Sequence, residues 1–125
     1  MKTGSDPRHQ HRIKLMQSLF SVSFRKRPLA SIAPIVERLA DIDQSITKAA
    51  PDWPVEKISR VDLAILRLAT YELMIEKKQP PKVIIDAAIE LAKEFGNDLS
   101  AKFINGALGA ILKTQNSVTR TQQSE

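Results

Sequence analysis

The chain has 125 residues, enough for one hydrophobic core but not for two independent ones. It contains no cysteine, which excludes disulfides, thiol nucleophiles and thiolate metal sites. The net charge is +5, and residues 1–28 hold seven Lys or Arg against one Asp, so the basic excess is local. A local excess favours a polyanionic partner that docks at one end of the molecule. The alternative is a solvated basic helix face.

The sequence gives no indication of export or membrane insertion. Its first residues are charged without an apolar stretch of signal-peptide length, and no later segment offers about 18 uninterrupted apolar residues. Together with the lack of cysteine, this predicts a cytoplasmic protein without membrane contact.

The first predicted helix covers residues 7–24. Pro7 suits a first turn behind Asp6 as N-cap, and apolar residues recur at helical spacing after it. Several basic side chains outside the apolar stripe could face solvent or a ligand near the positive end of the helix dipole. They are Arg8, His11, Arg12 and Lys14. His9 and His11 point to different helix faces, so they predict no metal site.

A second helix is predicted to begin around Ser31 and Pro34 and to end before Pro51. Only about one helix fits between Phe24 and Trp53. The following stretch, DWPVEKI, predicts a short helix or turn in which Trp53 packs against the core.

The next two helices have clear start and stop signals. Ser59 and Asp62 match the spacing of a capping box, and the run after them is apolar nearly all round, which predicts a central, buried helix. Pro81 suits the start of the following helix, and Gly96 its end.

A last helix is predicted to follow the cap residues around Asn97 and to end at Lys113. Gly106 and Gly109 lie within it at a cost of about 1 kcal/mol each, which predicts the close approach of another helix. Residues 114–125 are polar and predict a disordered tail. No strand pattern persists, so the predicted fold class is all-α, a bundle of about five to six helices.

The residues that catalysis needs are not brought together by any motif. Both histidines lie at the start of the first helix, without a nucleophile beside them. Glu72 with Glu76, and Glu90 with Glu94, are carboxylate pairs on polar helix faces, where solvated side chains are the expected state. No glycine-rich phosphate loop is present. We expect no enzymatic activity, no metal and no cofactor.

Three strings resemble the signature of the NusB antitermination factors: VDLAILRLATYEL, PPKVIIDAAIELAKEFG and SAKFINGALGAI. The resemblance is close over residues 59–112 and looser in RHQHRIKLMQSLF. It implies an all-α, non-enzymatic domain over residues 7–113, with a shortened N-terminal subdomain (7–50) and a C-terminal one (52–113). It also implies binding of single-stranded boxA-type RNA chiefly by the basic N-terminal helix, the ribosomal protein NusE as partner, and indirect contact with the RNA polymerase antitermination complex.

Position by position, the resemblance assigns RNA contacts to the first helix and to the turn before the last helix. The residues are Arg8, His9, His11, Arg12, Lys14, Phe20, Phe95, Lys102 and Phe103. Aromatic rings there could stack on unpaired bases, although Phe95 and Phe103 also fit core stripes. Contacts to the protein partner fall on Asp62, Arg67, Tyr71 and Glu72. Of these, Arg67 and Tyr71 could equally be internal links between subdomains.

Other interpretations remain open. The chain could be a protein-interaction adaptor that has lost or weakened RNA binding, because its N-terminal region is short and His9 and Gln10 thin the arginine cluster. Leu99 also replaces a polar or acidic residue common in the family. A detached relative of the NusB-like domain that precedes some rRNA cytosine methyltransferases is another alternative, although these 125 residues contain no methyltransferase domain. Self-association through the partner surface is a further one.

Overall fold

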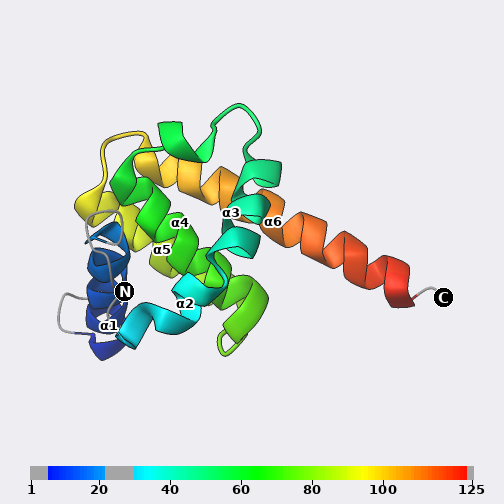
Figure 1. Cartoon of the computed structure of the whole chain (residues 1–125), viewed down its shortest axis with the longest axis horizontal. Helices are drawn as coiled ribbons and strands as arrows, with labels where there is room; N and C mark the ends of the chain where they lie inside the picture. Colours follow the sequence, from blue (N-terminus) through cyan, green and yellow to red (C-terminus); the bar gives the residue numbers. More distant parts are fainter. Residues whose placement is uncertain (1–5, 22–29, 124–125) are drawn as a thin grey trace.

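The computed structural model of the chain describes residues 6–21 and 30–123, with side chains described as far as residue 115. Over these ranges every regular element is helical, which confirms the predicted all-α class (Figure 1). The elements in chain order are α1 (Pro7–Phe20), η2 (Ala30–Ile32), α2 (Ala33–Glu37), α3 (Leu39–Ala49), η3 (Val55–Lys57), α4 (Arg60–Tyr71), η4 (Glu72–Glu76), α5 (Pro81–Phe95) and α6 (Ser100–Gln123).

Helix α4 forms the centre of the fold, as its apolar sequence predicts. Ser59 caps it, because the Ser59 hydroxyl accepts a hydrogen bond from the Asp62 backbone N–H at 3.2 Å. Helices α1, α3, α5 and α6 all pack against α4. A helix that is apolar nearly all round is stable only when neighbours cover each of its faces.

One continuous core runs through the described helices. Its largest fully buried apolar side chains are Ile32, Ile42, Ile46, Ile65, Leu66, Ile84, Leu91, Ile104 and Leu108. Because they come from both sides of residue 50, the two predicted subdomains share this core. The boundary between them stays a prediction.

The N-terminal region differs from the prediction. The expected continuation of α1 to Phe24 lies outside the described residues. The expectation of one helix before Trp53 is wrong, because α2 and α3 form there and are separated at Arg38. The Arg38 N–H donates to the Ile35 carbonyl at 3.1 Å, a three-residue turn that tightens the backbone. The two helices therefore run in different directions in Figure 1.

The end of α4 is a π-helical turn, η4. The Lys77 N–H donates to the Glu72 carbonyl, five residues back, at 2.9 Å. Lys77 itself has φ 54°, in the left-handed region that ends helices. The prolines that follow cannot continue the helix. Helix α5 then begins at Pro81, as predicted.

Gly96 ends α5 as predicted, and the physical reason is space. Its φ is −91°, a value open to any residue. An added Cβ, however, would lie 2.4 Å from the Ser100 hydroxyl oxygen and 2.8 Å from the Ala92 carbonyl oxygen. Only glycine fits this turn without movement of its neighbours.

Helix α6 differs from the prediction at its end. It continues to Gln123, so the disordered tail expected from residue 114 is wrong as far as Gln123. The Thr114 hydroxyl donates to the Ala110 carbonyl at 3.0 Å, and no Gly or Pro follows to stop the helix. Figure 1 shows this part of α6 projecting away from the other helices.

The two glycines within α6 are also not explained as predicted. Both Gly106 and Gly109 are exposed, and among the described residues an added Cβ at either would have no atom within 4 Å. The expected close approach of another helix is therefore wrong. At Gly106 the missing side chain leaves an open surface.

Candidate nucleic-acid interface

Helix α1 presents only some of its basic candidates to solvent. Because α1 packs on α4, Arg8, His11 and Lys14 are exposed, whereas His9 and Arg12 are buried. The prediction that Arg12 faces solvent or a ligand is therefore wrong.

Arg12 forms a buried ion pair with Glu72. Its Nε and Nη2 donate to the two carboxylate oxygens at 3.1 and 2.9 Å. The two side chains are only 7% and 11% exposed. The expectation of a solvated Glu72 was wrong because the spacing of Glu72 and Glu76 gives no information about which residue α1 places opposite them. The pair joins α1 to the end of α4.

His9 joins α1 to the last turn of α5. Its Nε2 lies 2.7 Å from Oε2 of Glu94, so Glu94 is also not simply a solvated carboxylate. Asn97 follows Glu94 by three residues and begins the turn to α6. This contact therefore brings the first turn of α1 next to the α5–α6 turn.

The exposed end of α1 borders a groove of about 400 Å³, here called the α1 groove. Its ionisable lining residues are Arg8, His11, Arg12, Glu72, Glu76 and Lys78. Tyr71 lines it as well. Residues predicted to contact RNA and residues predicted to contact a protein thus lie in the same groove.

A groove of about 670 Å³ lies at the opposite end of α4, between the loop before α4 and the first turns of α6. We call it the Trp53 groove. Its lining includes Trp53, Lys57, Asp62, Asn97, Leu99, Lys102, Phe103 and Gly106. Trp53 is 53% exposed and is not among the side chains that pack against the core, so the prediction that it packs against the core is wrong. Its ring instead meets the Phe103 ring edge-on, with centroids 6.1 Å apart.

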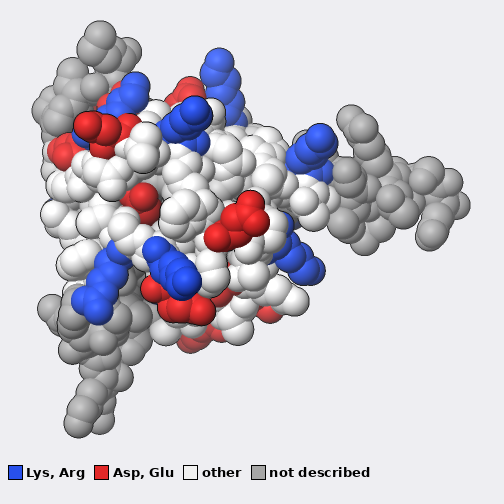
Figure 2. All heavy atoms as spheres, turned by 90° about the horizontal axis from the view of Figure 1, so that it is seen from above, with Lys and Arg blue, Asp and Glu red and all other residues white. Residues whose placement is uncertain are grey.

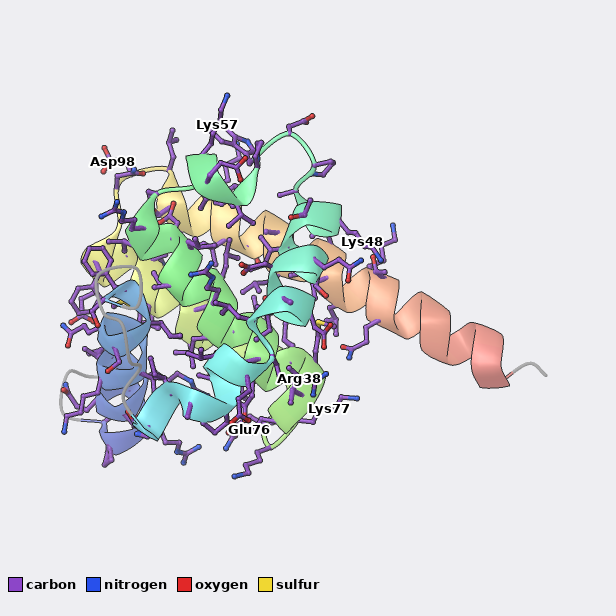
Figure 3. All side chains as sticks on the ribbon, in the orientation of Figure 1. Arg38, Lys48, Lys57, Glu76, Lys77 and Asp98 are labelled. Atoms are coloured by element: carbon purple, nitrogen blue, oxygen red, sulfur yellow. The ribbon has the colours of Figure 1, made fainter. Side chains whose placement is uncertain are left out.

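The charges on this side of the molecule are dispersed. Lys57 and Lys102 are both exposed, and Figure 3 shows Lys57 pointing outward from η3. Seen from above, Lys and Arg side chains alternate with Asp and Glu around uncharged surface, without a continuous basic patch (Figure 2). A polyanion could therefore make only a few phosphate contacts on this face.

The remaining predicted residues lie elsewhere. Phe95 is half-buried and packs against the core, which agrees with its place in an apolar stripe of the sequence. Phe20 is exposed and borders a third groove, of about 330 Å³, which Arg67 also lines.

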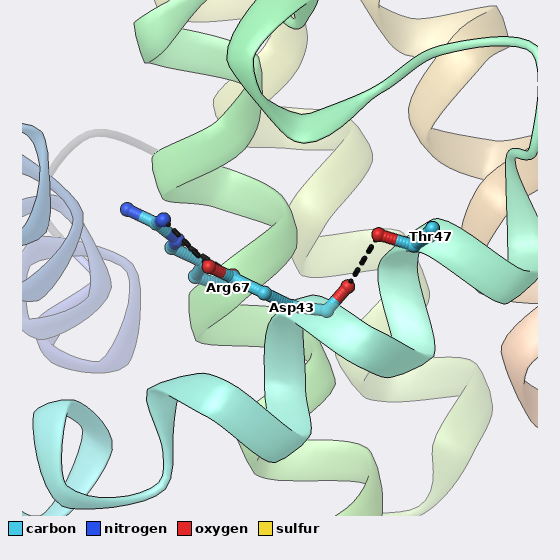
Figure 4. A network of polar contacts seen from close by, with 3 residues as sticks. All are labelled: Asp43, Thr47 and Arg67. Carbon is cyan, nitrogen blue, oxygen red and sulfur yellow. Dashed lines mark hydrogen bonds and ion pairs between the residues drawn. The ribbon is translucent and has the colours of Figure 1, made fainter.

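Arg67 donates through Nε and Nη2 to the two Asp43 oxygens at 2.9 and 2.8 Å (Figure 4). This confirms the alternative interpretation of Arg67 as an internal link, here between α3 and α4.

The tertiary structure thus brings residues predicted to contact RNA together with residues predicted to contact the protein partner. Asp62 lies with Lys102 and Phe103, Tyr71 with Arg8 and His11, and Arg67 with Phe20. Sequence reasoning missed Trp53, Lys57 and Gly106 as candidates. The available signals were a tryptophan between two loop prolines and a helical glycine without a packing partner.

Two further findings concern the described part of the chain. No three or more His, Asp or Glu side chains gather there in a way that could hold a metal ion. None of the helices described is long and apolar enough to cross a membrane.

The NusB family model matches residues 29–113, which is more than half of the chain. The chain belongs to the NusB family. The match includes the whole Trp53 groove and Arg67, while α1 lies before it.

Two relatives named transcription antitermination protein NusB show the degree of similarity. The protein from Roseiflexus castenholzii is 49% identical over 78 residues, and that from Pseudothermotoga lettingae is 44% identical over 80 residues. These alignments cover 61% and 64% of this chain and 55% and 57% of the relatives. The chain therefore spans about half the length of the curated NusB relatives it matches.

A solved structure of T. maritima NusB matches over more of the chain. The two structures align with a TM-score of 0.76 at 36% sequence identity. The alignment covers 90% of this chain and 93% of the T. maritima chain. The helical arrangement described above is therefore that of a NusB protein.

Proposed function

We propose that this NusB-family chain is a non-catalytic, cytoplasmic RNA-binding factor. It binds single-stranded boxA-type RNA together with the ribosomal protein NusE and helps to assemble an antitermination complex on RNA polymerase during rRNA transcription. The observation that carries the proposal is the Trp53 groove, where exposed aromatic surface lies beside Lys57 and Lys102. Unpaired bases stack on aromatic rings, and lysines neutralise phosphates.

The proposed RNA surface has two parts. Arg8, His11 and Lys14 are exposed on α1, and Lys102 and Phe103 line the Trp53 groove at the opposite end of α4. His9 and Arg12 hold α1 in place through Glu94 and Glu72 instead of touching RNA. Because the face seen in Figure 2 carries dispersed charges, contacts to bases would supply a large share of the affinity there.

The proposed contact with NusE uses the partly exposed candidates. Arg67 and Tyr71 retain accessible surface, whereas Asp62 and Glu72 are buried. A basic ribosomal protein would therefore meet the side chains around Tyr71 and Arg67, with Glu76 as a partly exposed acidic group in the α1 groove.

A second candidate function is a protein-binding adaptor without RNA binding. The observation that favours it is the burial of His9 and Arg12, which removes two of the five basic candidates on α1 from contact with RNA.

A binding titration separates the two functions. Labelled boxA-like single-stranded RNA is titrated with the chain, with and without NusE, between roughly 50 and 200 mM salt. Arg8→Ala should weaken binding and reduce the slope of log K against log salt by about 1, because one phosphate contact is lost. Lys48→Ala removes the same charge from an exposed position in α3, away from α1 in Figure 3, and should change neither quantity.

If RNA binding is undetectable at low salt even with NusE, the adaptor function replaces the RNA-binding one. If Lys48→Ala and Arg8→Ala have equal effects, the affinity reflects net charge, and α1 is not the contact surface.

A further inference from the structure

His9 is a buried histidine with one ring nitrogen in contact with a carboxylate. It is 3% exposed, and its Nε2 lies 2.7 Å from Oε2 of Glu94. Its other ring nitrogen, Nδ1, is buried and has no hydrogen-bond partner in the part of the chain that the structure describes. A carboxylate only accepts, so of the two neutral tautomers of His9 only the one with its proton on Nε2 can form this bond. The contact therefore assigns the proton to Nε2.

The first turn of α1 carries His9 beside a residue proposed to contact RNA. The Asp6 carboxylate caps this turn by accepting from the Arg8 backbone N–H at 2.9 Å. The Arg8 side chain is exposed and lines the α1 groove. Because consecutive side chains of a helix are about 100° apart, the burial of His9 decides on which side of α1 the Arg8 side chain emerges.

The other partner, Glu94, lies in the last turn of α5, close to the second part of the proposed RNA surface. Three residues on, the Asn97 N–H donates to the Ser100 hydroxyl at 2.9 Å. Asn97 also lines the Trp53 groove. The contact between His9 and Glu94 thus joins the turn that carries Arg8 to the turn that borders the Trp53 groove.

This contact matters because the end of a helix opens easily unless a neighbour holds it. Helix α1 packs mainly on α4, and the bond to Glu94 ties its first turn to α5 as well. Without the bond, the Arg8 side chain would sample several orientations. An RNA that contacts both parts of the surface would have to fix one of them on binding, which lowers its affinity.

We propose that His9, as the Nε2–H tautomer, is a positioning residue whose hydrogen bond to Glu94 orients Arg8 for a phosphate contact. This inference rests on the proposed RNA-binding function and adds a residue that acts on RNA without touching it. Loss of the bond should weaken RNA binding and the phosphate contact of Arg8 together, although no cation is removed.

The tautomer is tested on the full chain without RNA. Nitrogen-15 NMR of labelled histidine distinguishes a protonated ring nitrogen from an unprotonated one, and the sequence contains only two histidines. The exposed His11 is the internal reference. At about pH 8, above the usual titration range of histidine, His9 should show a protonated Nε2 and an unprotonated Nδ1. A proton on Nδ1 alone, or on both nitrogens, would overturn the assignment.

The positioning role is tested by titration of labelled boxA-like RNA in the presence of NusE. His9→Leu keeps an apolar side chain at the buried position but cannot donate. It should weaken binding about fivefold, the effect of one hydrogen bond, and reduce the slope of log K against log salt toward that of Arg8→Ala. The double variant should bind no more weakly than Arg8→Ala alone. His9→Gln, whose amide nitrogen can donate to Glu94, should restore both the affinity and the slope.

Glu94 offers a second pair of variants, which keeps the test decisive if circular dichroism shows that His9→Leu does not fold. The Glu94 side chain is 45% exposed, so either replacement avoids a change in the core. Glu94→Gln and Glu94→Leu remove the same charge, but only the glutamine can still accept from His9. Glu94→Gln should therefore bind RNA about fivefold more tightly than Glu94→Leu. Equal affinities would contradict the positioning role.

The possible failures are distinguishable. A weaker affinity of His9→Leu with an unchanged salt slope assigns His9 a structural role only and overturns the inference. If His9→Leu binds as the wild type does, the proposed function stands and the positioning role fails. If boxA-like RNA does not bind the wild type even with NusE present, the proposed function and the positioning role fail together, while the NMR measurement still decides the tautomer.

Discussion

At the scale of single residues, the role of a charged side chain depends on which residue the neighbouring helix places opposite it. Arg8 and Arg12 are one helical turn apart, and the sequence predicts the same role for both. In the fold, Arg8 is exposed, whereas Arg12 meets Glu72 in a buried pair. The two partners are 60 residues apart in sequence, so no local pattern could have shown their contact.

Replacement of Arg12 should therefore affect stability before it affects binding. Arg12→Met is expected to lower the free energy of unfolding by about 3 kcal/mol, because Glu72 loses its buried partner. The double variant Arg12→Met with Glu72→Leu should recover most of this loss, since neither charge is then buried alone. Urea unfolding followed by circular dichroism measures both.

Arg38→Met serves as the control for this experiment. Arg38 pairs with Asp41 at 3.2 Å on the surface, with both side chains largely exposed. Its replacement should change the free energy of unfolding by less than about 0.5 kcal/mol. A similar loss in the Arg12 and Arg38 variants would mean that burial of the Arg12 pair has no energetic consequence.

At the scale of elements, local signals predicted most helix starts and stops. The Ser59 cap, Pro81 and Gly96 act where the sequence placed them, because caps and prolines work through bonds to residues close in the chain. The break at Arg38 and the continuation of α6 had no such signal. The role of a glycine was also not predictable, because it depends on which atoms surround the glycine in the fold.

The glycines give a prediction at this scale. Gly96→Ala should lower the free energy of unfolding by about 1–3 kcal/mol, because the new Cβ overlaps the Ala92 carbonyl oxygen and Ser100. Gly106→Ala and Gly109→Ala should each raise it by up to about 1 kcal/mol, since alanine is the better helix former and no described atom opposes it. Thermal unfolding of the three variants provides the comparison. A loss at Gly106 or Gly109 would show that an unseen contact covers that side of α6.

At the scale of the whole molecule, the helices on both sides of residue 50 share one core. Buried residues from Ile13 to Ile111 form a single cluster, and the Asp43–Arg67 pair links α3 to α4. The sequence predicted two subdomains from the resemblance to NusB proteins, and it could not show how much core they have in common.

A shared core predicts cooperative unfolding. In urea, the loss of helix measured by circular dichroism and the change in Trp53 fluorescence should have the same midpoint, as in two-state domains. The fluorescence reports on the contact of Trp53 with α6, while the helical signal reports on every helix. Separate midpoints would show that residues 7–50 and 52–113 unfold independently.

The sequence by itself determined the helical class, the family, and the ends of the helices that carry caps or prolines, because these follow from hydrophobic periodicity and short-range hydrogen bonds. Tertiary structure alone decided that Arg12 is buried, that Trp53 is exposed, and that Asp62 and Phe103 line the same groove. Which side chains are buried, and which residues they contact, depends on helices that come from distant parts of the chain. The composition of each groove therefore became visible only when those helices were packed together.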